Sequence, residues 1–300
     1  MRSELTSVDS IGRYIAANRG KCLRPALLLL TARSVGNISD VAIRAAVGIE
    51  LLQISTLLHD DVIDDSPTRR GNASVNVRWG NATAILMGDV LFTRALSLFT
   101  ESDSIAIMRS ASVQSRIMLE GEVAAKDLRD SPEFNEETYL DIIRRKTGAM
   151  TSLACEIGAQ LNDAPEDIVE HMRSFGRELG VAFQIADDIL DVTGDETVVG
   201  KPTGQDLREG NVTLPFLRAL RSAPEEEANT IRAKVKTGIT TDEEWSHVKE
   251  FIQTYRGVEA ATEVAHQTTT VAREYLNCLA PSTARQSLQR LLGYVLRRHR

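Results

Sequence analysis

Residues 49–71 read IELLQISTLLHDDVIDDSPTRRG, and this stretch decides how the rest of the chain is interpreted. It is apolar with helical spacing as far as Leu58, after which carboxylates dominate, at Asp60, Asp61, Asp64 and Asp65. Asp60 and Asp64 are four residues apart, so on a helix they lie one turn apart on the same side. Because like charges at this spacing repel, the pattern predicts a bound cation. Mg²⁺ suits it best, since Mg²⁺ is usually held by carboxylates together with substrate phosphates.

A second stretch, residues 180–195, repeats the pattern as GVAFQIADDILDVTGD. The D-D-x-x-D spacing is the same, and Gln184 lies one turn before the first aspartate. Two such clusters, each preceded by apolar sequence, predict two helices that face each other across a metal-filled cavity. The candidate metal ligands are Asp60, Asp61, Asp64, Asp187, Asp188 and Asp191.

The periodicity predicts helix along almost the whole chain, and we find no alternating strand pattern. Glycine and proline mark the breaks, and Thr241 to Glu244 has the capping-box pattern T-x-x-E. The expected fold is all-α, a single domain over residues 1–300 with about ten or more helices around a central cavity. Helices are predicted within 5–17, 23–35, 40–65, 82–101, 104–128, 136–162, 166–192, 213–222, 224–236, 241–254, 257–278 and 282–298.

Composition excludes several classes of protein. The net charge of −7, from 35 basic and 42 acidic residues, argues against a nucleic-acid partner. Three widely spaced cysteines without a C-x-x-C pair argue against a disulfide framework or a zinc site, and they fit a cytoplasmic location. The N-terminus lacks the apolar region of a secretory signal, and the apolar run at 26–30 is too short for a transmembrane segment.

The chain resembles the trans-isoprenyl diphosphate synthases, or polyprenyl synthetases, over nearly its whole length. Both aspartate motifs match that family, and so does an ordered set of shorter motifs. These are GKCLRP (20–25), RRG (69–71), GE (121–122), KTG (146–148), FQ (183–184) and GKPTGQDLREGNVTLP (200–215). The resemblance implies an isoprenoid synthase-like fold, a homodimer, and Mg²⁺-dependent condensation of isopentenyl diphosphate with an allylic prenyl diphosphate.

The resemblance also assigns roles to residues. For isopentenyl diphosphate it implies binding by Lys21, Arg24, Gln53 and Arg70. For the allylic diphosphate it implies Arg69, Lys146, Thr147, Gln184 and Lys201. The residues expected to act in catalysis are Asp60, Asp64, Lys146, Asp187 and Lys201. No side-chain base is evident, and by family precedent the released diphosphate takes the proton.

Plainer interpretations of these residues stay open. In one such interpretation, Lys21 and Arg24 belong to a solvated basic loop. In another, Arg69 and Arg70 form ion pairs with Asp64 and Asp65. Gln53 stands where many family members have histidine, and a packing role is about as well supported. His59 is expected to pack or to support the aspartates, because its type does not suit Mg²⁺. The chain departs from the family pattern in its short N-terminus and at Arg19, Cys22 and Asn211.

Product length is expected to depend on Ser55, Thr56 and Leu52. Short-chain members of the family have a bulky aromatic residue five positions before the first aspartate motif, where this chain has Ser55. The small side chain of Ser55 leaves room below the growing prenyl chain, which predicts a product longer than geranylgeranyl. The alternative is a geranylgeranyl diphosphate synthase. Less favoured are a class I terpene cyclase, which would have no use for Lys21, Arg24 and Arg70, and a subunit of a heteromeric synthase, which would be expected to lose aspartates.

Overall fold

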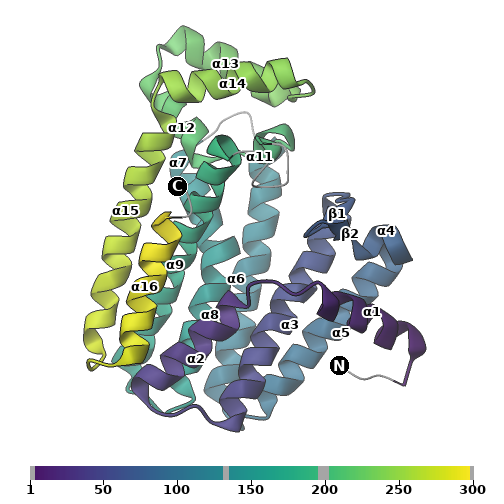
Figure 1. The fold of residues 1–300 in the computed structure, drawn as a ribbon, viewed down its shortest axis with the longest axis vertical. Helices are drawn as coiled ribbons and strands as arrows, with labels where there is room; N and C mark the ends of the chain where they lie inside the picture. The colour runs from purple at the N-terminus through teal and green to yellow at the C-terminus, as the bar shows by residue number, and fades with distance from the viewer. Residues whose placement is uncertain (1–3, 131–134, 195–202, 298–300) are drawn as a thin grey trace. The chain divides into compact units, whose positions relative to one another are not determined.

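The computed structural model describes residues 4–130, 135–194 and 203–297. Nearly all of the described chain is helical (Figure 1), which confirms the all-α prediction. Packing of the backbone divides the chain into two compact units. Unit 1 comprises residues 1–112 and 154–165, and unit 2 comprises 113–153 and 166–300. The expectation of a single domain around a central cavity concerns both units together and stays a prediction.

Unit 1 is built on the contact between its two long apolar helices, α3 and α5, which lie side by side in Figure 1. One face of α3 packs on α5: Gly48 lies under the ring of Phe99, and the ring of His59 lies against Gly88. Leu52 and Ser55 lie between them at helical spacing and are buried. The elements of unit 1 are α1 (Thr6–Ala17), α2 (Leu23–Val35), α3 (Asp40–Ile63), β1 (Thr68–Arg69), β2 (Asn72–Ala73), α4 (Val75–Trp79), α5 (Asn81–Thr100), the start of α6 (Ile105–Asp130) and the end of α8 (Ala149–Gln160).

Unit 2 is organised around α9, whose side chains divide into two stripes. Val181, Ile185, Ile189 and Val192 recur at helical spacing and belong to the core of this unit. A polar stripe runs along the same turns and carries Gln184 and the second aspartate cluster. The remaining elements of unit 2 are α7 (Glu136–Ile143), η1 (Arg144–Gly148), α9 (Glu166–Thr193), α11 (Gln205–Arg208), α12 (Leu214–Ser222), α13 (Glu225–Thr237), α14 (Asp242–Thr254), α15 (Gly257–Tyr275), η2 (Leu276–Cys278) and α16 (Thr283–Arg297).

Most predicted helices are present with ends within a few residues of those expected. The capping box is also present, because Thr241 and Glu244 exchange side-chain-to-backbone hydrogen bonds. The absence of strands was wrong in one place: β1 and β2 form a two-stranded antiparallel hairpin directly after the first aspartate cluster. Each strand has only two residues, too few to show an alternating pattern.

Two helices of the described chain, α3 and α5, are long and apolar enough to cross a membrane by length and composition alone. The core helix of a folded protein passes the same test. These two helices pack on each other, and half of the apolar window of α3 is buried. Their apolar character is thereby explained within unit 1.

Candidate active site

The first aspartate cluster lies at the C-terminal end of α3, where its members differ in environment. Asp61 is only 2% exposed, and its carboxylate accepts hydrogen bonds from Nε of Arg69 at 2.8 Å and from the Nη2 atom of the same residue. Asp60 is half-buried, and Asp64 caps the helix end and is exposed. Arg69 therefore pairs with Asp61, a partner that the sequence did not suggest. Asp60 and Asp64 are thus more accessible than Asp61.

The residues expected to bind isopentenyl diphosphate all belong to unit 1. Lys21 and Arg70 are exposed, while Arg24 and Gln53 are half-buried. Nη1 of Arg70 donates to the carbonyl oxygen of Asn18 at 2.8 Å. The guanidinium lies against Gly20, so the structure brings Arg70 to the start of the GKCLRP motif.

The expected chain-length residues lie further back on α3. Ser55 is 1% exposed and Leu52 is fully buried on the face that packs on α5. Thr56 is half-buried, and its hydroxyl donates to the carbonyl oxygen of Gln53 at 2.9 Å. His59 points to α5, with Nε2 at 3.2 Å from the carbonyl oxygen of Ile85, which agrees with packing duty.

In unit 2 a pocket of about 130 Å³ brings three of the five expected allylic-site residues, Lys146, Thr147 and Gln184, together with Asp188 of the second aspartate cluster. Arg69, which was also expected there, belongs to unit 1. The polar side chains that line it come from α6, α7, η1, α9 and α11 and from the turn after α11. They are Arg129, Tyr139, Lys146, Thr147, Gln184, Asp188, Asp206, Asn211 and Thr213.

The KTG motif lies in a π-helical turn, η1, where the sequence predicted continuous α-helix. Such turns occur mostly as single bulges within α-helices, often at functional sites, and they change the direction of the side chains that follow. Nζ of Lys146 is 2.7 Å from Oε2 of Glu122, and Thr147 donates to Oε1 of Gln184 at 2.8 Å. Gly121 allows this approach, because a Cβ at that position would lie 2.8 Å from the backbone nitrogen of Lys146.

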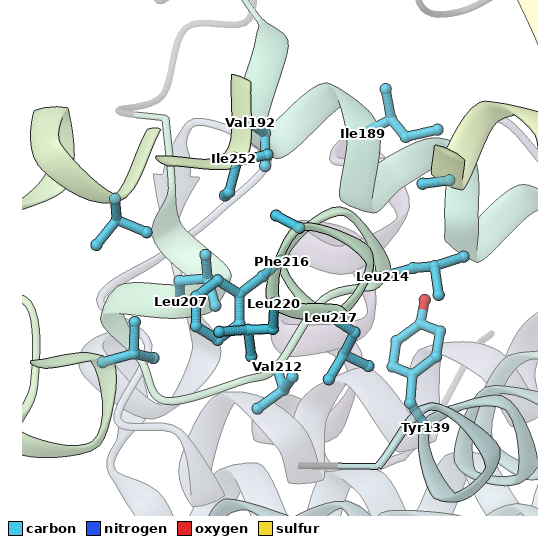
Figure 2. Packing of buried hydrophobic residues seen from close by; sticks show 14 of the residues in the cluster. Tyr139, Ile189, Val192, Leu207, Val212, Leu214, Phe216, Leu217, Leu220 and Ile252 are labelled. Atoms are coloured by element: carbon cyan, nitrogen blue, oxygen red, sulfur yellow. The ribbon is translucent and has the colours of Figure 1, made fainter. Parts of the chain in front are cut away.

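Asp188 is the most deeply held carboxylate of unit 2. It is 2% exposed, and Oδ2 accepts hydrogen bonds from the hydroxyl of Tyr139 at 2.5 Å and from the backbone N–H of Leu214 at 3.2 Å. Oδ1 accepts a hydrogen bond from Nε2 of Gln184 at 3.0 Å. Figure 2 shows Tyr139 among the core side chains, its hydroxyl directed toward Leu214. Burial raises the pKa of Asp188 to about 7, although these hydrogen bonds lower it.

The other carboxylates of this cluster are more accessible. Asp191 is half-buried and accepts hydrogen bonds from the backbone N–H groups of Gln205 and Asp206, at 3.1 and 3.2 Å, so it caps the short helix α11. Burial and the neighbouring charges of Asp188 and Asp191 raise the pKa of Asp206 well above its usual range. Asp187 is half-buried. The second aspartate cluster and Asp206 thus bring several acidic side chains together in a partly buried site.

Two further positions of the pocket concern the phosphate contacts expected from the sequence. Asn211, which stands where the family often has lysine, accepts a hydrogen bond from Nη2 of Arg129 at 2.9 Å. Arg129 therefore supplies a cation next to the neutral side chain of Asn211. Lys201 lies outside the described residues, and its assignment to the allylic diphosphate stays a prediction.

Sequence reasoning missed Tyr139 and Glu122 as parts of this site. Each contacts a predicted residue that is distant in sequence, Asp188 for Tyr139 and Lys146 for Glu122. The GE motif was a signal for Glu122, whereas Tyr139 had none, because its periodicity fits an ordinary core position.

The donor chemistry of both clusters fits Mg²⁺. Over the ranges that the structure describes, no three histidine, cysteine or acidic side chains converge closely enough to form a complete metal site. Mg²⁺ does not need such a cage, since it is usually bound through one or two carboxylates, waters and substrate phosphates. Burial raises the pKa of Asp206 most, and the charges of Asp188 and Asp191 raise it further, so a bound cation would favour the ionised carboxylates.

The hydrogen bond to Asp188 generates a prediction. Tyr139→Phe should lower the free energy of unfolding by about 1–3 kcal/mol, because it leaves a buried carboxylate with one donor fewer. It should also raise the pKa of Asp188 further, since the lost hydrogen bond favoured the ionised form. Urea unfolding and an infrared titration of the carboxyl groups would measure the two effects.

The matched control is Tyr255→Phe. The half-buried Tyr255 also donates to a carboxylate at 2.6 Å, but that carboxylate belongs to the exposed Glu227. This variant should leave stability nearly unchanged. Equal effects of the two substitutions would show that burial of Asp188 does not set the strength of its hydrogen bond.

Comparison with known proteins identifies the family. A family model described as polyprenyl synthetase matches residues 6–254. The all-trans-nonaprenyl-diphosphate synthase (geranyl-diphosphate specific) of Rhodobacter capsulatus is 37% identical over 298 residues, which cover 99% of this chain and 90% of that protein. The geranylgeranyl diphosphate synthase of Methanosarcina mazei is 37% identical over 212 residues, 69% of this chain and 65% of that protein.

A solved structure extends the likeness to the fold. The polyprenyl synthase of Caulobacter crescentus, in complex with calcium and isoprenyl diphosphate, matches with a TM-score of 0.93 and 31% identity. The match covers 100% of this chain and 91% of that one. The chain therefore belongs to the polyprenyl synthetase family and is a trans-prenyltransferase.

Proposed function

We propose that this enzyme condenses isopentenyl diphosphate with an allylic prenyl diphosphate to make an all-trans polyprenyl diphosphate longer than geranylgeranyl. The observation that carries the proposal is the pocket of unit 2. In it, hydrogen bonds of 2.8 and 3.0 Å link Thr147 to Gln184 and Gln184 to Asp188 of the second aspartate cluster, and Lys146 lines the same pocket. A diphosphate bound there would meet cationic and hydroxyl donors together with carboxylates that can share a cation with it.

The two substrates are assigned to different sets of residues. Lys21, Arg24, Gln53 and Arg70 bind the diphosphate of isopentenyl diphosphate; the exposure of Lys21 and Arg70 supports this part. The allylic diphosphate is bound by Arg69, Lys146, Thr147, Gln184 and Lys201. Arginine offers a planar fork of donors to phosphate oxygens, whereas lysine offers a point charge.

The members of each aspartate cluster have different duties in this proposal. Asp60, Asp64, Asp187 and Asp191 would hold Mg²⁺. Bound Mg²⁺ would stabilise the negative charge that grows on the leaving diphosphate. Asp61 and Asp188 are also candidate ligands, but each is only 2% exposed and accepts hydrogen bonds from protein side chains. We assign them mainly to fixing the geometry of each cluster.

The chain's own cations complete the stabilisation of the leaving group. Lys146 is oriented by Glu122 and, with Lys201, adds positive charge where the C–O bond of the allylic substrate breaks. The double bond of isopentenyl diphosphate then attacks the allylic carbon. A proton is lost to the released diphosphate, and the product is one isoprene unit longer.

The rival functions make different use of the same residues. A class I terpene cyclase needs no second diphosphate site, so the cations at Lys21, Arg24 and Arg70 would be idle. A geranylgeranyl diphosphate synthase differs only in product length, and the likeness to the Methanosarcina mazei enzyme keeps it as the alternative. A subunit of a heteromeric synthase would be inactive alone.

One assay separates these functions. The purified chain is incubated with radiolabelled isopentenyl diphosphate, geranyl or farnesyl diphosphate and Mg²⁺, and the dephosphorylated products are resolved by thin-layer chromatography. The proposal expects extended products beyond the twenty-carbon length. Cyclic hydrocarbons formed without isopentenyl diphosphate would support a cyclase, and an inactive chain would support a heteromeric enzyme.

The metal assignment generates a prediction. Asp60→Asn, and separately Asp187→Asn, should lower kcat about a hundredfold or more, because metal stabilisation of the leaving group is worth several kcal/mol. The helical circular dichroism should stay unchanged, since both side chains are half-buried at helix surfaces. Asp103→Asn is the control, because Asp103 is exposed and asparagine tolerates its positive φ of 52°. Turnover near that of the wild type in either cluster variant would overturn the assignment.

Product length depends on Ser55, Thr56 and Leu52 in this proposal. One helical turn is about 5.4 Å, comparable to one isoprene unit, so a bulky side chain one turn nearer the site should shorten the product by about one unit. Ser55→Tyr should therefore shift the main product to a shorter chain while condensation continues. Chain lengths are read by thin-layer chromatography.

The control substitution is Val47→Tyr, on the same helix but 48% exposed. It should leave the product distribution unchanged. Because Ser55 is buried, its variant also needs a thermal melt, since overpacking costs about 1–3 kcal/mol. A folded Ser55→Tyr enzyme with the chain lengths of the wild type would remove Ser55 from the set that limits elongation.

The homodimer is also part of the proposal. Ile85, Leu86 and Val90 are exposed on α5, and neighbouring apolar side chains on a surface indicate an interface. Light scattering at micromolar concentration should give about twice the mass of one chain, and a monomer would contradict the prediction. The free cysteines support the cytoplasmic location that we propose.

A further inference from the structure

Arg70 occupies a backbone conformation that arginine rarely adopts. The loop between β1 and β2 consists of Arg70 and Gly71, with φ values of 54° and 77°. A two-residue hairpin loop with positive φ at both positions usually takes asparagine or aspartate followed by glycine. A long side chain in the left-handed region costs about 1–2 kcal/mol, and strain of this kind gathers at functional sites. Position 70 thus carries an arginine although its backbone conformation disfavours one.

The Arg70 side chain is held at its tip by the C-terminal end of α1. Asn18 is the C-cap residue of α1, and its carbonyl oxygen accepts the hydrogen bond from Nη1 at 2.8 Å. A cation at the C-terminus of a helix is favoured by the helix dipole. The side chain of Asn18 also accepts a hydrogen bond from Nδ2 of Asn72 at 2.8 Å, which ties the helix end to β2.

Gly20 provides the surface on which the guanidinium lies. A Cβ at this position would lie 2.7 Å from Cζ of Arg70, too close for any side chain unless the guanidinium moved away. The colliding group is the flexible tip of an arginine and not backbone, so the fold can tolerate the added methyl while Arg70 is displaced. Lys21 follows Gly20 directly, so this contact places Arg70 beside the first cation of the GKCLRP motif.

Helix α1 is itself fixed to the hairpin and to α4. The hydroxyl of Tyr14 donates to the carbonyl oxygen of Ala73 at 2.6 Å, and its ring meets that of Trp79 edge-on at 5.1 Å. The guanidinium of Arg78 lies 4.7 Å from the Tyr14 ring and 4.8 Å from the Trp79 ring. The helix end that receives Arg70 is therefore anchored on the side of the hairpin.

The charge of Arg70 remains available for a ligand. Within the part of the chain that the structure describes, Arg69 pairs with the buried Asp61, whereas Arg70 pairs with no carboxylate. The hydrogen bond from its guanidinium goes to a neutral carbonyl oxygen, and the side chain is exposed. A guanidinium has five N–H donors, so most of them can still bind phosphate oxygens.

We propose that Gly20 and the C-terminal carbonyl of α1 form a seat that positions Arg70 for the diphosphate of isopentenyl diphosphate. Gly20 and Asn18 are positioning residues that act through Arg70. The inference rests on the proposed function for the identity of the ligand. It adds why the motif begins with glycine and what the short N-terminal helix contributes to the site.

The test is a double-mutant cycle of Gly20→Ala and Arg70→Ala, measured by steady-state kinetics with isopentenyl diphosphate varied. Gly20→Ala should raise KM for isopentenyl diphosphate about tenfold, which corresponds to about 1.4 kcal/mol, with kcat and the allylic KM within about twofold of the wild type. Arg70→Ala should raise the same KM at least as much. In the Arg70→Ala background, Gly20→Ala should have no further effect, because the group it displaces is gone.

Thermal melts and a second glycine serve as controls. Gly293→Ala, at a helical position where a Cβ would make ordinary contacts of 3.4 Å or more, should leave all constants unchanged. The Tm of Gly20→Ala should stay close to that of the wild type. An unchanged KM in Gly20→Ala, or an equal rise in KM in the presence and absence of Arg70, would overturn the seat.

Calorimetric titration with isopentenyl diphosphate alone separates this inference from the proposed function. A wild type that binds isopentenyl diphosphate but forms no product would contradict the proposed function, while the Kd values of the cycle still test the seat. If Arg70→Ala binds isopentenyl diphosphate as the wild type does, Arg70 is not a ligand of that substrate and the seat is overturned. The seat is supported if Gly20→Ala raises the Kd for isopentenyl diphosphate in the wild-type background but not in the Arg70→Ala background.

Discussion

The burial of Asp188 is the constraint on which the arrangement of unit 2 depends. A carboxylate taken out of water is costly unless donors satisfy its oxygens. Three segments supply them: Tyr139 from α7, Gln184 from the preceding turn of α9, and the first amide of α12 at Leu214. Thr147 adds η1 through its contact with Gln184. The elements that line the pocket therefore assemble around one buried charge, and the core side chains pack behind them (Figure 2).

Unit 1 satisfies the same constraint with a different partner. The second aspartate of its cluster, Asp61, is buried as deeply as Asp188, and the guanidinium of Arg69 pairs with it. In both units, the second aspartate of the D-D-x-x-D motif is buried and bonded to protein side chains, while the aspartates at the preceding and third following positions are more accessible. The repeated motif thus corresponds to a repeated division between a fixed carboxylate and accessible ones.

The sequence predicted most of the fold because helical periodicity and local caps determine it. The end of α3 near Asp64 and the capping box at Thr241 are set by residues within one turn of each other. The π-turn at 144–148 was missed, since it results from a shift of backbone hydrogen bonds that leaves the apolar period nearly intact. Tyr139 and Glu122 were missed because their partners lie on other segments, which no single-segment pattern reveals. Family resemblance located the substrate residues, but not the contacts that hold them.

The helix α11 has a consequence for how this site folds. It has four residues, far below the length at which a helix persists in water by itself. Its first amides are satisfied by the carboxylate of Asp191, and the amide of Gly204 by the Asp191 carbonyl oxygen. Helix α11 is therefore not an independent piece of structure. It belongs to the same cooperative unit as the end of α9, so opening that end to solvent would release both together.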